Sequence, residues 1–264
     1  MNQITPLHSA TPRHLPKRLL GVWAHPDDEA YMSAGLMGRV IAAGGHVTVV
    51  TATLGERGTD DPARFGSAAF ARTRHAELIA SLAILGVHDV QTFGYADGGC
   101  DGADDESAVD RIVDAIADVD PDTIVTFGPD GITGHPDHAA VSGWTTEAWR
   151  RTDSSELLYA TMTHDFVRRN RELHDRVGFF TDFGDGRPTS VSRTSVALEC
   201  VLTGSELARK RRALAAHATQ TTRLAAAVGE RRYTTWWGRE TFRSPTPIER
   251  NSALATGRAV IGAA

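Results

Sequence analysis

The chain of 264 residues is predicted to fold as an α/β protein with a mostly parallel sheet and helices on both faces. Short apolar runs alternate with longer segments of helical periodicity, which is the pattern of strand–helix–strand crossover units. Glycines and prolines separate many of these runs, as expected at element boundaries. The length suits one large domain and is ample for a buried core.

The first half of the chain alternates most regularly. Gly44 and Gly86 directly follow two of the helical segments, and glycine is common just past a helix C-terminus. Pro121 precedes the fourth strand. In chain order, we expect strand 18–23, helix 30–43, strand 46–53, helix 68–85, strand 90–95, helix 107–119, strand 123–127 and helix 138–151.

The second half is less regular. We expect strands over 157–161 and 195–201 and an amphipathic helix over 205–221, whereas residues 165–194 fit no element clearly. The last 40 residues, which contain Trp236 and Trp237, are expected to wrap irregularly around the domain. The predicted organisation is a flexible N-terminal segment over 1–17 and a single domain over 18–264 with an irregular C-terminal extension.

Composition narrows the class of partner and the compartment. The chain carries 28 basic and 33 acidic side chains, a net charge of −5, which argues against nucleic acid or an anionic membrane as the main partner. Cys100 and Cys200 are the only cysteines, too few for a disulfide scaffold, although one disulfide between them stays possible. No signal-peptide core or membrane-length apolar run is present. We expect a cytoplasmic protein with a small polar or neutral substrate, and its oligomeric state is open.

Two short motifs follow predicted strands and carry most of the chemistry. Ala-His-Pro-Asp-Asp-Glu occupies 24–29 and Gly-His-Pro-Asp-His occupies 134–138. Within each motif two of the side chains stand at i and i+3, on one side of a helical turn. Imidazole and carboxylate are the ligands that zinc takes without thiolate. Because ligand sites gather beyond the carboxyl ends of parallel strands, the motifs predict one divided metal site.

The i, i+3 geometry favours His25, Asp28 and His138 as metal ligands, with Asp27 as the general base. Three protein ligands leave a position for water, whose pKa falls from about 16 toward neutrality on a divalent ion. His135 is expected to stabilise the oxyanion and protonate a leaving amine. The neighbouring Asp137 is expected to orient His135 through a ring nitrogen. The alternative is that these residues only cap helices at strand ends.

The two motifs together resemble the signature of the LmbE/PIG-L family of zinc-dependent N-deacetylases. Further matches cover about residues 18–222: the loop 53–58, the helical Arg-x-x-Glu of 74–77, the loop 95–99, Asp120-Pro121-Asp122, and Lys210, His217 and Gln220. The resemblance implies a Rossmann-like sheet, a zinc held by two histidines and an aspartate, and removal of an acyl group from an amino sugar.

Carried over residue by residue, the resemblance places the metal on the same three ligands, Asp27 as the base and His135 as electrophilic assistant. Arg74 and Asp97 match family positions that contact sugar hydroxyls, and Arg57 is a further candidate for substrate binding. Each has a structural alternative: Arg74 could pair with Glu77 one turn along, Asp97 could fold its glycine-rich turn, and the loop of Arg57 could simply be solvated.

Two other residues of these motifs are assigned structural roles. Glu29 suits the first helical turn, and His217 is expected to pack or hydrogen-bond in the core.

The leading hypothesis is a metal-dependent hydrolase that removes an N-acyl group, most simply N-acetyl, from an amino-sugar-containing small molecule by attack of a metal-bound water. The alternatives are an amidase acting on a larger sugar-thiol or antibiotic conjugate and a non-catalytic sugar-binding protein on the same fold. The cofactor is expected to be Zn2+, with Fe2+ possible because the same ligands accept either ion.

Overall fold

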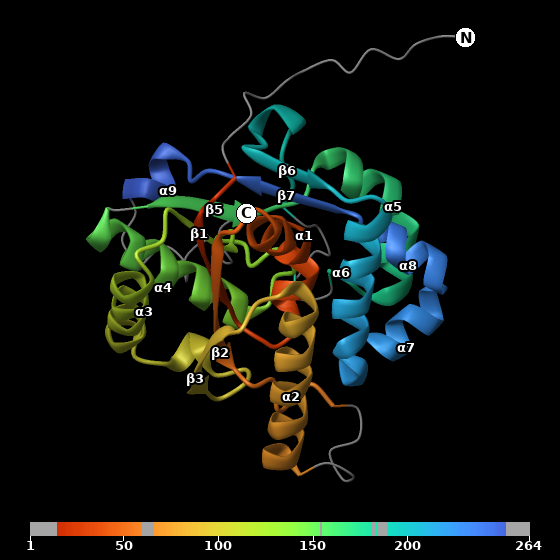
Figure 1. Cartoon of the computed structure of the whole chain (residues 1–264), viewed down its shortest axis with the longest axis horizontal. Helices are drawn as coiled ribbons and strands as arrows, with labels where there is room; N and C mark the ends of the chain where they lie inside the picture. The colour runs from red at the N-terminus through yellow and green to blue at the C-terminus, as the bar shows by residue number, and fades with distance from the viewer. Residues whose placement is uncertain (1–14, 60–65, 154, 181–182, 184–188, 252–264) are drawn as a thin grey trace.

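The computed structural model describes residues 15–59, 66–153, 155–180, 183 and 189–251. Within them, seven strands form one sheet in the order β3-β2-β1-β4-β5-β7-β6 (Figure 1). Strands β1 to β5 run parallel, whereas β7 is antiparallel to both of its neighbours. The mostly parallel sheet is therefore confirmed. The strands are β1 Arg18–Trp23, β2 His46–Thr53, β3 Asp89–Tyr95, β4 Thr123–Phe127, β5 Glu156–Ala160, β6 Leu198–Val201 and β7 Arg239–Arg243.

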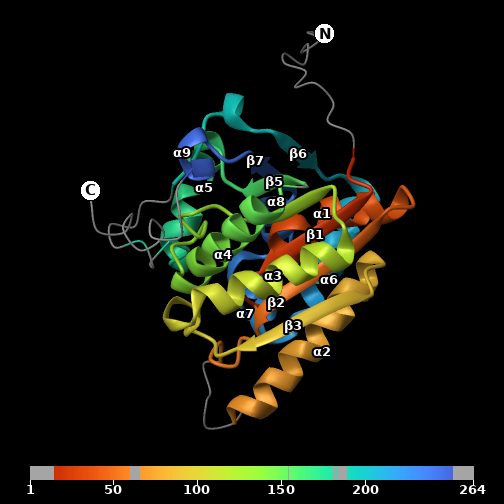
Figure 2. The ribbon, with the colours of Figure 1, turned by 90° about the vertical axis from the view of Figure 1, so that its left-hand side faces the viewer.

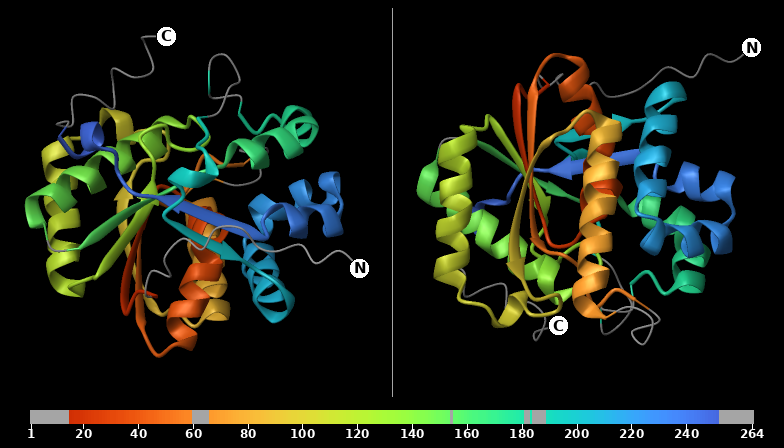
Figure 3. Two further views of the ribbon diagram at one scale, coloured as in Figure 1. Left: turned by 90° about the horizontal axis from the view of Figure 1, so that it is seen from above. Right: turned by 60° about the horizontal axis from the view of Figure 1, so that its bottom comes forward.

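Helices cover both faces of the sheet. Helices α3 and α4 pack on one face, and α1, α2 and α6 lie on the other (Figures 2 and 3). The helices are α1 Asp28–Ala42, α2 Ser67–Leu85, α3 Asp105–Val119, α4 Pro136–Thr152, α5 His164–Val177, α6 Gly204–Ala216, α7 Ala218–Val228, α8 Glu230–Trp236 and α9 Pro247–Asn251, with short 3-10 turns at Cys100–Gly102 and Arg193–Ser195.

The central strands form the core and are buried along nearly their whole length, threonines as well as apolar residues. Every residue of β4 is buried, and in β1 and β2 only the first residue is exposed. Such continuous burial is expected when helices cover both faces of a parallel sheet. Edge strand β3 instead alternates between half-buried and exposed residues over its second half.

Most predicted elements of the first half match the structure, but the helix predicted over 205–221 is wrong. The structure has two helices, α6 and α7, that meet at His217. The backbone of His217 leaves the helical region at φ −80° and ψ 54°, and its side chain turns inward to Glu29. The Leu214 carbonyl accepts from the backbone N–H of His217 at 3.1 Å and from Thr221 Oγ1 at 2.8 Å, which ties the end of α6 to the first turn of α7.

The irregular C-terminal extension is also wrong for the part that the structure describes. Strand β7 is inserted into the sheet between β5 and β6, and α8 packs Tyr233 and Trp236 in a second apolar cluster. The sequence signal was weak because β7 reads Arg-Glu-Thr-Phe-Arg. Its Glu240 is buried as an ion partner rather than exposed as a charge. Residues 252–264 lie outside the described residues.

The N-terminal segment predicted to be flexible is described only from residue 15. Leu15 packs against the main core, and the backbone N–H of Lys17 donates to Asp122 Oδ2 at 2.8 Å. The remainder of that segment lies outside the described residues. Cys100 and Cys200 are both buried and free, so they are not joined. Among the described residues, no helix has the length and apolar character needed to span a bilayer.

The strand order places the two histidine motifs side by side. Strand β1 lies between β2 and β4, so the chain order reverses between β1 and β4, and their carboxyl ends flank the crevice where open α/β sheets bind ligands. His25 lies two residues beyond the end of β1, and His135 directly precedes α4.

Candidate active site

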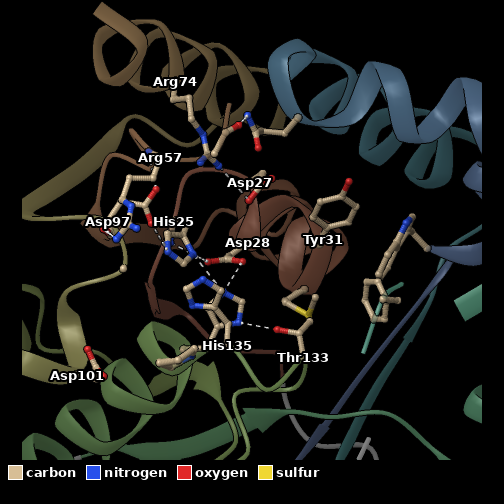
Figure 4. A pocket seen from close by; sticks show the side chains of 18 residues that line it. His25, Asp27, Asp28, Tyr31, Arg57, Arg74, Asp97, Asp101, Thr133 and His135 are labelled. Atoms are coloured by element: carbon tan, nitrogen blue, oxygen red, sulfur yellow. Dashed lines mark hydrogen bonds and ion pairs between the residues drawn. The ribbon is translucent and has the colours of Figure 1, made fainter. Parts of the chain in front are cut away.

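A cavity of about 610 Å³ opens at the carboxyl ends of β1, β3 and β4 (Figure 4). It brings together all the predicted site residues except Asp137. Its lining consists of His25, Asp27, Asp28, Tyr31, Met32, Arg57, Gly58, Arg74, Asp97, Gly98, Asp101, Thr133, His135, Pro136, His138, Phe179, Gln220 and Trp237.

The three predicted ligands face one another in this cavity. His25 Nδ1 lies 3.1 Å from His138 Nε2. The two carboxylate oxygens of Asp28 span the rings, with Oδ2 3.5 Å from His25 Nδ1 and Oδ1 3.5 Å from His138 Nε2. All three side chains are buried. We call these facing atoms the donor triangle.

The outward nitrogen of each ring is held by an acceptor. His25 Nε2 lies 3.2 Å from Asp97 Oδ1 and 3.2 Å from Asp137 Oδ2. His138 Nδ1 lies 3.0 Å from the carbonyl oxygen of Gly131. Because carboxylates and carbonyls accept hydrogen bonds, the outward nitrogens are the N–H groups of the neutral rings, and the inward nitrogens present lone pairs. This is the arrangement of metal-binding histidines.

The ring of His138 is fixed further by Phe127, which stacks on it at 4.1 Å between centroids with 7° between the planes. Ligands about 2.0 to 2.1 Å from a tetrahedral zinc lie about 3.3 Å from each other. The triangle edges of 3.1 to 3.5 Å match that spacing. His135 also offers a nitrogen within 4.8 Å of the other two rings. The residues therefore fit a divalent cation.

The electrostatics of the triangle favour a positive charge at the same place. Burial lowers the pKa of His25, but contacts with Asp137, Asp28 and Asp97 outweigh burial and raise it well above the usual value. Burial raises the pKa of Asp28, but His138 and His25 more than reverse this effect. Burial lowers the pKa of His138 to about 4, which keeps that ring neutral. A neutral imidazole is the form that binds a metal.

Asp137 has a different partner from the one predicted. Its carboxylate accepts from the backbone N–H of Gly98 at 2.7 Å and of Cys100 at 3.0 Å, and it contacts His25. The prediction that this carboxylate orients His135 is wrong, because it turns from α4 toward the loop after β3. Only the backbone N–H of Asp137 donates to His135 Nδ1, at 3.2 Å.

His135 caps helix α4 and lines the cavity. Since its Nδ1 accepts from a backbone N–H, its Nε2 carries the proton when the ring is neutral. Its ring lies 4.8 Å from that of His25 and 5.0 Å from that of His138, centroid to centroid. It is thus a hydrogen-bond donor beside the donor triangle.

Asp27 sits in a strained backbone conformation at the start of α1. Its φ is 112° and its ψ −26°. Residues other than glycine adopt this backbone conformation at a cost of about 1 to 3 kcal/mol. The Asp27 backbone N–H donates to Glu29 Oε2 at 2.9 Å, and Glu29 Oε1 lies 2.8 Å from His217 Nε2. Both partners are fully buried. The structural roles predicted for Glu29 and His217 are confirmed.

The carboxyl group of Asp27 is poised to exchange a proton near neutral pH. Burial raises its pKa to about 7, partly offset by Arg74 and reinforced by Asp28. Arg74 Nη2 lies 3.6 Å from Asp27 Oδ1, and Arg74 is itself held by the carbonyls of Gly55 and Pro26. The alternative pairing of Arg74 is not formed, since Glu77 accepts from Thr219 instead.

Asp97 does more than fold its turn. Its Oδ1 meets His25, and its Oδ2 accepts from the backbone N–H of Arg57 at 2.8 Å. The guanidinium of Arg57 has a long contact, 3.4 Å, with the Asp97 carbonyl. Arg57 and Asp97 lie together on one side of the cavity (Figure 4).

Sequence reasoning missed the opposite side of the cavity, which Tyr31, Met32, Phe179 and Trp237 line. Tyr31 stands three residues after Asp28 in α1, so helical periodicity could have placed it beside the ligands. Phe179 and Trp237 belong to segments far along the chain, and no local pattern links them to the motifs.

Comparison with known proteins agrees with this geometry. Residues 20–149 match the family model described as PIG-L, GlcNAc-PI de-N-acetylase. A 1D-myo-inositol 2-acetamido-2-deoxy-alpha-D-glucopyranoside deacetylase from Corynebacterium glutamicum is 33% identical over 225 residues, covering 77% of this chain and 74% of the relative.

Two solved structures share the fold. The A40926 pseudoaglycone deacetylase Dbv21 aligns with a TM-score of 0.62 and 20% identity, covering 86% of this chain and 96% of that one. The 4-carboxy-2-hydroxymuconate hydratase GalB from Pseudomonas putida aligns with a TM-score of 0.58 and 18% identity, covering 88% and 97%. The fold alone therefore accommodates more than one reaction. The identity with the curated relatives, over most of both chains, is what places this chain in the PIG-L family.

Proposed function

We propose that this protein is a metal-dependent N-deacetylase that hydrolyses the N-acetyl amide of an amino-sugar-containing small molecule. The observation that carries the proposal is the donor triangle of His25, Asp28 and His138, with the carboxyl group of Asp27 beside it. The names of the curated relatives, which describe deacetylation of a glucosamine–inositol compound, support the same reaction class.

His25, Asp28 and His138 would hold the metal, and we propose zinc, because two imidazoles and a carboxylate form one of its usual donor sets. Ferrous iron accepts the same ligands and is the alternative. When bound, a divalent ion polarises the amide carbonyl and lowers the pKa of a water molecule. Asp97 and Asp137 would keep the proton of His25 on its outer nitrogen and so hold its inner lone pair in place.

Asp27 would act as the general base. With a pKa raised to about 7, its carboxylate would take a proton from the attacking water near neutral pH, where a general base is most effective. His135 would donate its Nε2 proton as a hydrogen bond to the carbonyl oxygen while negative charge develops there. As the carbon–nitrogen bond breaks, the proton taken by Asp27 would pass to the departing amine, so the products are acetate and a free amino sugar.

Arg57, Arg74 and Asp97 would line the side of the cavity that receives the sugar. The guanidinium of Arg57 makes only a long contact with the Asp97 carbonyl and lines the cavity. It would therefore be available to donate a hydrogen bond to a sugar hydroxyl. Arg74 is fixed by backbone carbonyls and by Asp27, so we assign it mainly to positioning the base.

The test is bound metal per chain, measured by elemental mass spectrometry on protein purified without a chelating tag. We expect about one divalent ion per chain in the wild type and less than about a tenth of that in His138→Ala. The matched control is His46→Ala, since His46 is an exposed histidine on β2 remote from the cavity. A wild type that holds no metal after reconstitution, or releases no amine from N-acetylated sugars, would contradict the proposal.

A further inference from the structure

The cavity has two unlike sides, separated by the donor triangle. Arg57 and Asp97 lie on one side of His25 and Asp28, and Tyr31 lies on the other (Figure 4). With Tyr31, the far side is lined by Met32, Phe179 and Trp237. We call these four residues the aromatic wall.

The aromatic wall offers the cavity mainly carbon atoms. The hydroxyl of Tyr31 is already engaged with the hydroxyl of Tyr233 at 2.7 Å. The indole Nε1 of Trp237 is buried and has no partner among the described residues, so it does not open onto the cavity, although its ring does. A polyhydroxylated group on this side would find few hydrogen-bond partners, whereas an apolar group would lose none.

The wall is held in place by neighbouring rings. The Trp237 centroid lies 4.6 Å from that of Tyr31, 5.6 Å from that of Phe179 and 4.6 Å from that of Trp236. Such contacts fix aromatic side chains in a single arrangement. Small-molecule sites commonly combine a pre-formed apolar surface with a few placed polar groups, and in this cavity the two kinds of side chain lie on opposite sides of the donor triangle.

We propose that the substrate is amphiphilic, with a sugar on the Arg57 and Asp97 side and an apolar group on the aromatic wall. This inference rests on the proposed function. An amide bond at the donor triangle directs its amine half and its acyl half in opposite directions. With the sugar on the polar side, the acyl half extends toward the wall. An apolar group attached elsewhere on the sugar has the same chemistry and is the second source.

Two substrate series separate these sources. One is glucosamine carrying N-acetyl, N-butyryl or N-hexanoyl; the other is N-acetylglucosamine as its methyl or phenyl glycoside. With zinc-loaded enzyme, we expect kcat/KM to rise about fourfold per added methylene in the first series if the acyl chain meets the wall. A rise of about tenfold from methyl to phenyl glycoside instead assigns the wall to the glycoside. If neither series gains, the proposal is overturned.

Variants test whether the wall itself causes the gain. Phe179→Ala and Trp237→Ala should each reduce the butyryl-to-acetyl or phenyl-to-methyl ratio by at least about threefold. Phe179 is only partly buried, so its variant carries the test if the Trp237 variant does not fold. The control Ile79→Ala removes an exposed apolar side chain of α2 and should keep the wild-type ratio. An unchanged ratio in Phe179→Ala would contradict the role of the wall.

Binding of the same compounds to protein freed of metal by a chelator distinguishes failure of this inference from failure of the proposed function. We expect calorimetry to give at least tenfold tighter binding for N-hexanoylglucosamine than for N-acetylglucosamine, or for the phenyl than for the methyl glycoside. If no amide is hydrolysed but this difference is present, the amphiphilic site stands and the deacetylase proposal fails. Equal affinities within both series would overturn the amphiphilic site whatever the activity.

Discussion

Two buried clusters of charged side chains contact helix α1 at different turns: the Lys210–Glu240 ion pair and the donor triangle. They differ in where the positive charge that balances their carboxylates comes from. At the middle of α1, Lys210 Nζ lies 2.7 Å from Glu240 Oε1, and the same carboxylate accepts from the backbone N–H groups of Gly35 and Leu36. The cation is part of the chain, and a second of its N–H groups donates to the Tyr31 carbonyl at 2.6 Å. This cluster is complete without a ligand.

The donor triangle at the start of α1 is built in the opposite way. Three carboxylates, those of Asp28, Asp97 and Asp137, converge on the single imidazole of His25, and the inward nitrogen of that ring faces another lone-pair donor on His138. The difference teaches how a stability cluster and a binding cluster can be told apart: the first has its counter-charge within the chain, whereas the second leaves room for one from outside.

The largest expected effect comes from removing the built-in cation. Lys210→Met leaves Glu240 buried without its ion partner, which should lower the free energy of unfolding by about 3 to 5 kcal/mol. Urea unfolding followed by circular dichroism measures this loss. Adding Glu240→Gln should recover part of it, because the amide carries no charge yet can still accept a backbone N–H. A single variant that loses less than about 1 kcal/mol would mean that the two clusters do not differ in this way.

A large effect on activity without a matching loss of stability is expected beside the donor triangle. Asp27→Asn removes the proposed base but keeps the shape of the side chain, so kcat should fall about 10²- to 10⁴-fold while bound metal stays at the wild-type level. Activity assays and elemental analysis on the same preparation check both halves. Activity within tenfold of the wild type would remove Asp27 from the mechanism.

Asp27→Gly is the matched variant for stability. It removes the same carboxyl group, but glycine accepts the positive φ of this position without steric cost. We therefore expect Asp27→Gly to be more stable to urea than Asp27→Asn by about 1 kcal/mol, although both lack the proposed base. Equal stabilities would show that the backbone at Asp27 is not strained.

Chelation should lower stability by less than Lys210→Met does, and its effect should be confined to the donor triangle. A ligand present at 100 times its dissociation constant stabilises the folded state by about 2.7 kcal/mol. Removing the metal from the wild type should therefore lower its unfolding free energy by about that amount. His25→Ala, which lacks one corner of the triangle, should respond to the chelator by less than about 0.5 kcal/mol. An equal response in both proteins would place the stabilising metal elsewhere.

The donor triangle could be predicted from the sequence because each of the two motifs that form it is short and directly follows a strand. His25 and Asp28 are three residues apart, as are His135 and His138, and both pairs follow strands whose apolar character is plain. Parallel strands with their carboxyl ends at one edge then bring the pairs together. The same reasoning gave the bounds of β1, β2 and β4.

What sequence reasoning could not give depends on side-chain direction and on pairing between distant segments. Asp137 points to the backbone of Gly98 and Cys100 rather than to its near neighbour His135, and no spacing rule specifies that choice. Strand β7 carries a buried Glu240 whose partner Lys210 lies on another helix. Because charged residues are usually exposed, a charged residue that is paired in the core is predicted from the sequence to lie on the surface.

The last expected effect is confined to acid pH and concerns His174, a buried base that has neither kind of counter-charge. His174 lies among Phe179, Phe180 and Trp236, and the indole N–H of Trp236 donates to His174 Nε2 at 3.2 Å. Burial lowers the pKa of His174 to about 4, below the value of about 6.5 in an unfolded chain. Above pH 6.5 both states leave this ring neutral, so folding has no proton cost there. As the pH falls toward 4, only the unfolded state binds the proton, and stability declines.

Between pH 6.5 and pH 5 the wild type should lose about 1 to 2 kcal/mol of unfolding free energy through His174. His174→Phe has no proton to bind at this position, so its stability should fall less over the same interval, whatever its stability at pH 7. Urea unfolding of both proteins at pH 7, 6 and 5, with chelator present to remove any metal contribution, makes the comparison. Parallel declines in the two proteins would mean that other groups cause the acid sensitivity and that His174 is not kept neutral by the fold.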